Sequence, residues 1–154
     1  MEYLLVKWVH VLSSTLLFGT GLGSAFYMFF TNRSYDVRAI AVVSRRVVIA
    51  VWLFTSPTAV IQPATGFYLL HLAGMPLSAR WVVWSIALYI VAGACWLPVV
   101  WIQIQMAKLA RHAADSDEAL PQRFWRYHLT WTLLGIPAFV AFVAIFYLMV
   151  VKPG

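Results

Sequence analysis

Two histidines lie in long apolar stretches of this sequence, and they are the side chains best suited to hold a metal. His10 stands in the uncharged run 8–32, and His71 stands near the end of the uncharged run 47–79. A histidine inside a membrane is costly and usually functional, and imidazole is a common axial ligand of haem iron. We therefore predict a site for one b-type haem, with His10 as an axial ligand and His71 as the second ligand.

Small side chains share the helical face of His10. Ser13, Ser14, Leu17 and Gly21 follow it at spacings that place them on one stripe of a helix. Such a stripe leaves room for a flat macrocycle, so Ser13, Ser14 and Leu17 are expected to line the cofactor. The alternative is a neutral buried histidine that forms hydrogen bonds with a serine or a carbonyl on another helix.

Two cations are expected at the same site. Lys7 lies one turn before His10, and Arg80 follows the turn after His71, so both could hold haem propionates. A polar stripe on this predicted helix is formed by Thr55, Thr58, Gln62 and Thr65. His71 lies about 180° around the helix from Gln62, on the side opposite to this stripe. If that stripe faces inward, His71 faces outward unless Pro63 rephases the helix. Met75 is a weaker substitute ligand.

The elements that must position these residues are membrane helices. The chain has 154 residues, of which 63% are hydrophobic and only 10% are charged. Its charges separate four uncharged runs, each longer than the roughly 20 residues that cross a bilayer. The sequence predicts an all-α, four-transmembrane-helix antiparallel bundle, in one domain over 1–154, with spans near 4–30, 47–71, 80–107 and 127–151.

Basic residues predict how the bundle is oriented. The connections 31–46 and 108–126 contain eight of the eleven lysines and arginines, which by the positive-inside rule face the cytoplasm. Both termini and the turn 72–79 are then on the outer, periplasmic side, and a bacterial inner (cytoplasmic) membrane is the expected location. The basic excess thus marks topology, and no nucleic-acid partner is expected. His128 is expected at the membrane interface, near lipid phosphate.

Several catalytic classes lack their residues in this sequence. No Asp or Glu falls within a predicted span, which disfavours proton pumping through a buried carboxylate. There is also no H-E-x-x-H motif, no G-x-S-x-G motif, no P-loop and no dinucleotide fingerprint. What remains is a site built on histidine.

Two resemblances concern the same segments. The sequence KWVHVL at 7–12 with LLFG at 16–19 resembles the opening helix of the bacterial membrane-integral protoporphyrinogen oxidases, which implies that His10 binds haem. The third helix of that family opens with His and Lys, where this chain has Val83 and Ser85. Over nearly its whole length the chain resembles small four-helix bacterial proteins described only as predicted integral membrane proteins. That likeness rests on the first helix, WLFTSP at 52–57, TG at 65–66, PLS at 76–78 with Trp81 and Trp84, and LP at 120–121.

The functional prediction is a haem b-binding integral membrane protein with a role in electron transfer or a linked oxidation, which leaves open whether it is a haem-dependent oxidoreductase. Its partners would be the lipid bilayer, a quinone or a periplasmic or membrane redox protein, and a homo-oligomer is an open alternative. The main rival is a cofactor-free protein that assists membrane assembly or binds a lipid or small solute. A channel or carrier, lined by Gln62, Gln103 and Gln105, is a third alternative.

Overall fold

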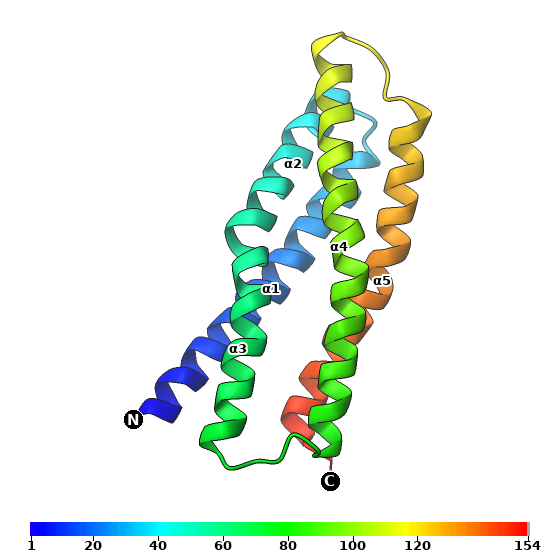
Figure 1. The fold of residues 1–154 in the computed structure, drawn as a ribbon. Coiled ribbons are helices and arrows are strands. Elements are labelled where there is room, and N and C mark those ends of the chain that lie inside the picture. Colours follow the sequence, from blue (N-terminus) through cyan, green and yellow to red (C-terminus); the bar gives the residue numbers. More distant parts are fainter. Residues whose placement is uncertain (154) are drawn as a thin grey trace.

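The chain folds into an all-helical bundle, seen in a computed structural model that describes residues 1–153 (Figure 1). The helices are α1 (Glu2–Asn32), α2 (Val37–Ala50), η1 (Val51–Thr55), α3 (Ser56–Leu72), α4 (Arg80–Asp115) and α5 (Gln122–Val151). Because α2, η1 and α3 follow one another without a break, the chain forms four helical rods. This confirms the all-α bundle expected from the sequence.

Three helices, α1, α4 and α5, are long and apolar enough to cross a membrane. The predicted second span, 47–71, is instead divided among α2, the π-helical turn η1 and α3. Pro57 lies two residues after η1 ends, and a proline there removes a backbone donor and favours such a local change in helical register. Four crossings and the direction of the termini remain predictions.

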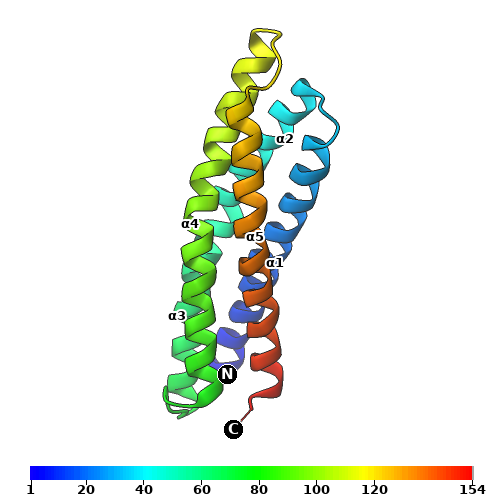
Figure 2. The same cartoon turned by 90° about the vertical axis from the view of Figure 1, so that its right-hand side faces the viewer.

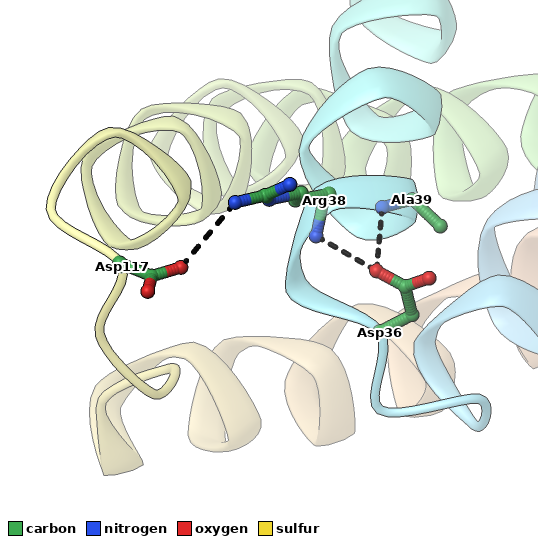
Figure 3. A network of polar contacts seen from close by, with 4 residues as sticks. All are labelled: Asp36, Arg38, Ala39 and Asp117. Carbon is green, nitrogen blue, oxygen red and sulfur yellow. Dashed lines mark hydrogen bonds and ion pairs between the residues drawn. The ribbon is translucent and has the colours of Figure 1, made fainter.

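The connections between rods are shorter than the charge pattern suggested. The segments 31–46 and 108–126 were expected to be loops, but the chain leaves helix only near 33–36 and 116–121. Asp36 starts α2 early because its carboxylate accepts hydrogen bonds from the backbone N–H groups of Arg38 and Ala39, at 3.0 and 3.1 Å (Figure 3). Arg38 also forms an ion pair with Asp117 at 3.5 Å, which joins the two connections.

The two ends of the bundle differ in what they contain. Both connections just described lie at one end, while the chain termini and the turn after α3 lie at the other (Figures 1 and 2). We call these the loop half and the terminal half of the molecule. The rod of α2, η1 and α3 packs on α1, α4 packs along α5, and α2 joins the two pairs.

The apolar core lies in the loop half. Its cluster draws on α1, α2, η1, α4 and α5: Met28, Ile40, Val47, Val51, Ile102, Met106, Ala110, Phe124 and Trp131. Met28, Ile40, Met106 and Phe124 have no exposed surface. Side chains from all four rods therefore meet in this half.

One proline in the terminal half shows how that half is held together. Pro63 interrupts α3 and leaves the carbonyl of Ala59, four residues earlier, without its helical donor. The Tyr89 hydroxyl of α4 donates to that carbonyl at 2.6 Å. A neighbouring helix thus satisfies the group that proline frees, as membrane helices require.

Candidate functional site

His10 is held by hydrogen bonds from both of its ring nitrogens to α3. Nδ1 lies 2.8 Å from the Thr65 hydroxyl, and Nε2 lies 3.1 Å from the amide nitrogen of Gln62. These partners are 52 and 55 residues away in the chain. The cluster therefore fastens the first helix to the third.

The hydrogen-bond partners in this cluster favour one tautomer of His10. Thr65 donates its hydroxyl proton to the Ile61 carbonyl at 2.7 Å, so its oxygen accepts from Nδ1–H of His10. Nε2 then carries the lone pair and accepts from the Gln62 amide. The Ser13 hydroxyl lies within donor distance of the Gln62 amide oxygen and of the His10 carbonyl, the latter at 3.0 Å. Each of these side chains therefore has a hydrogen-bond partner within the cluster.

Space around the ring is filled on the side of α3. A Cβ atom at Gly66 would lie only 3.3 Å from Cε1 of His10, so glycine permits the close approach of the two helices. Ser13, expected to leave room for a macrocycle, is 4% exposed and is covered by Gln62. Leu17 is buried, and the Ser14 hydroxyl donates to the Val11 carbonyl of its own helix. Within the small stripe, Ser13 thus contacts α3, whereas a Cβ atom at Gly21 would meet no atom within 4 Å.

The other residues expected at this site lie elsewhere. His71 is exposed on the last turn of α3, six residues beyond Thr65. Because the stripe of Thr55, Thr58, Gln62 and Thr65 does face inward, the helical period turns His71 away from it. Lys7 is exposed beside the Tyr3 ring of its own helix, and Arg80 is at the start of α4 in a separate groove.

The structure does not bring the expected haem-site residues together around His10, so the haem site stays a prediction. His10 and His71 do not share a face, and Lys7 and Arg80 are not gathered around His10. Within residues 1–153 no group of three or more His, Cys, Asp or Glu side chains could hold a metal ion. Nε2 of His10 already has a hydrogen-bond partner, the Gln62 amide, at 3.1 Å.

An open groove lies instead between α4 and α5 in the terminal half. It has a volume of about 470 Å³, within the range of roughly 300–1,000 Å³ typical of small-molecule sites. Its lining is aromatic and aliphatic with one cation: Arg80, Trp81, Trp84, Leu88, Ala144, Tyr147, Leu148 and Pro153. A second groove, of about 370 Å³, lies between α1 and α2 and contains Arg46.

Sequence reasoning did not anticipate the surroundings of His128. Its Nδ1 lies 3.1 Å from the amide nitrogen of Asn32, which is 1% exposed, and its ring stacks on Trp131 at 5.9 Å. The half-buried side chain of His128 therefore contacts α1 through Asn32 and packs on its own helix through Trp131. The signal that could have revealed this was Asn32, a polar residue at the end of an apolar run.

Comparison with known proteins gives one match. The family model described as "Predicted integral membrane protein (DUF2269)" matches residues 4–153. No curated protein and no solved structure matches the chain. The match supports the resemblance to small predicted integral membrane proteins, and nothing in the comparisons supports the resemblance to protoporphyrinogen oxidases.

Proposed function

The chain belongs to DUF2269, a family of predicted integral membrane proteins, and we propose that it is a cofactor-free protein that binds a lipid between its helices. The proposal rests mainly on the groove between α4 and α5. This groove is open, apolar and rimmed by Trp84 and Tyr147, residue types that favour the membrane–water interface. A lipid chain is the most abundant ligand of that chemistry in a bilayer.

The His10 cluster has a supporting role in this proposal. Hydrogen bonds between membrane helices contribute about 0.6 kcal/mol each and at most about 1.7 kcal/mol. Two such bonds and the close contact at Gly66 hold α1 against the rod of α2, η1 and α3. We call this cluster the His10 clamp. It positions α1 against α3, while the groove lies between α4 and α5.

Filling the groove tests this function. Ala144 lines it and faces Leu88 and Tyr147 there, so Ala144→Trp should occupy the volume of the ligand. The protein is purified in a mild detergent, and co-purifying lipid is counted by native mass spectrometry. We expect the wild-type chain to keep lipid and Ala144→Trp to lose it, while Ala94→Trp, at an exposed site on α4, keeps it. Equal retention in all three proteins would refute lipid binding in this groove.

A second candidate function keeps haem b at His10, with a role in electron transfer or a linked oxidation and a quinone or redox protein as partner. The observation that favours it is the tautomer, because Nε2 has the lone pair that iron needs and Thr65 orients the ring through Nδ1–H. Gln62 would have to release Nε2, and that hydrogen bond is worth only about 0.6–1.7 kcal/mol. Bound haem would supply one-electron chemistry.

An absorption spectrum separates the two candidates. The haem proposal requires a Soret band that His10→Ala removes and that Gln62→Leu leaves in place. The lipid proposal expects neither variant to change the visible spectrum. Haem is added to the growth medium during expression, so that the wild-type protein has access to the cofactor.

A further inference from the structure

Two cations lie at one end of the α4–α5 groove, where Trp81 is part of the lining. Arg80 lines the groove and precedes Trp81 in the chain. Lys152 approaches the same ring from the other helix, with Nζ 5.5 Å from the centre of the Trp81 ring. Trp81 is only 8% exposed, so its ring is a fixed surface for Lys152.

The backbone at the end of α5 brings Lys152 back over the groove. Lys152 caps the helix in the left-handed conformation, with φ 45° and ψ 58°, and its N–H donates to the Leu148 carbonyl at 2.9 Å. This conformation is usually taken by glycine and costs a side-chain-bearing residue about 1–2 kcal/mol. The cation–π contact with Trp81 offsets part of that energy.

No acidic side chain balances these cations. The groove has no Asp or Glu in its lining. Within residues 1–153 the ion pairs are Arg38 with Asp117 and Arg111 with Asp115, both in the loop half. Glu2, the one acidic residue near the other terminus, accepts a hydrogen bond from Tyr68 on α3. Arg80 and Lys152 therefore form a positive site that lacks a counter-charge from the described side chains.

We propose that this site binds the phosphate of an anionic phospholipid whose acyl chain occupies the α4–α5 groove. The inference rests on the proposed function and adds the chemical class of the ligand. Arginine and lysine on neighbouring helices bind lipid phosphate, and the exposed aromatic rings lie at the depth of the headgroups. A net negative headgroup is preferred to a zwitterionic one, since Arg80 and Lys152 are both cationic and, among residues 1–153, no Asp or Glu lines the groove to receive an ammonium group.

The experiment measures headgroup preference in the full-length chain. Phosphatidylglycerol and phosphatidylcholine with identical acyl chains are titrated against the detergent-purified protein, and bound lipid is followed by native mass spectrometry. We expect phosphatidylglycerol to bind more tightly, and Arg80→Gln and Lys152→Gln each to weaken it about fivefold without changing phosphatidylcholine binding, at about 1 kcal/mol per cation. Lys152→Arg should retain wild-type affinity.

The matched control is Arg46→Gln, which removes the cation from the groove between α1 and α2 and should leave this preference unchanged. Equal binding of the two lipids, or unchanged affinity in both glutamine variants, would overturn the headgroup assignment and leave lipid binding intact. If the wild-type protein binds neither lipid, the proposed function is refuted instead. Displacement of the lipid by soluble glycerol phosphate would show a free-phosphate site and contradict the proposed lipid ligand.

Discussion

The loop half and the terminal half of this bundle are stabilised in different ways. In the loop half, fully buried apolar side chains from four rods interlock, among them Met28, Ile40 and Phe124. In the terminal half, α1 is fastened to α3 by the His10 hydrogen bonds and touches α5 through Phe18, whose ring lies 5.3 Å from Phe146. The groove between α4 and α5 opens in that same half.

This difference shows how a small membrane protein can be both stable and open. The dispersion energy of a side chain falls steeply when a void replaces neighbouring atoms, so a well-filled core resists deformation. Directional hydrogen bonds, by contrast, hold two helices together at one point along their length and leave the adjacent helix surfaces unpacked. A ligand site is therefore expected in the half with polar clamps, and a rigid base in the half with the apolar core.

Truncation of the apolar core should produce the largest effect. Phe124→Ala removes a ring that has no exposed surface at the start of α5, and a change of this kind lowers the free energy of unfolding by about 3–5 kcal/mol. Denaturant unfolding in detergent micelles measures the loss. Leu133→Ala, at a side chain that is 59% exposed, is the control. A loss for Phe124→Ala no larger than that control would contradict the assigned core.

The Asn32–His128 contact should come next. Asn32→Ala leaves Nδ1 of His128 without its partner inside the bundle, and an unsatisfied buried polar group costs about 1–3 kcal/mol. The same unfolding assay applies. Asn32→Ala combined with His128→Leu should recover part of the loss, because an apolar pair leaves no group unsatisfied. A double variant less stable than either single variant would break this account of the site.

The His10 clamp should make a smaller contribution to the free energy of unfolding, one that depends on both partners being present. A double-mutant cycle with His10→Ala and Gln62→Ala should report a coupling of about 0.6–1.7 kcal/mol. The control cycle pairs His10→Ala with His71→Ala, for which additive effects are expected because His71 is exposed and faces away. Additivity in the first cycle would mean that the two side chains do not interact in the bilayer.

The ion pair that joins the two connections should matter least. Arg38 and Asp117 are 81% and 90% exposed, and exposed pairs contribute about 0–1 kcal/mol. Arg38→Ala should therefore leave the unfolding curve nearly unchanged. Asp36→Ala is a sharper comparison in the same place, because loss of the α2 cap costs about 0.5–2 kcal/mol. The reverse order of these two effects would contradict the capping role seen in Figure 3.

The sequence allowed the helical bundle to be predicted, but not the arrangement of its candidate site. Uncharged runs indicate long apolar helices because the bilayer imposes their length, and three of the four predicted spans lie in such helices. The helical period also places Gln62 and Thr65 on one face and His71 on the opposite one. Which helix meets His10 depends on contacts between residues more than fifty positions apart, and no spacing within one span contains that information.

Other expectations failed for local reasons. The early start of α2 depends on Asp36 as a cap, so charged residues from 38 onward belong to helix rather than loop. Arg80 was expected near His10 because both were placed in the same leaflet, but depth alone does not determine the neighbouring helix. In the structure Arg80 lines the groove between α4 and α5 instead, and Lys152 contacts Trp81 of that groove.

The state of the His10 ring tests the central claim most directly, namely that α3 occupies both nitrogens and leaves the terminal half stabilised by a clamp. Nitrogen NMR of the protein labelled with ¹⁵N-histidine resolves protonated from unprotonated ring nitrogens. We predict a neutral His10 with a proton on Nδ1 and a hydrogen-bonded lone pair on Nε2, whose signal shifts in Gln62→Leu. A His10 signal broadened by iron, or one unaffected by Gln62→Leu, would contradict the account.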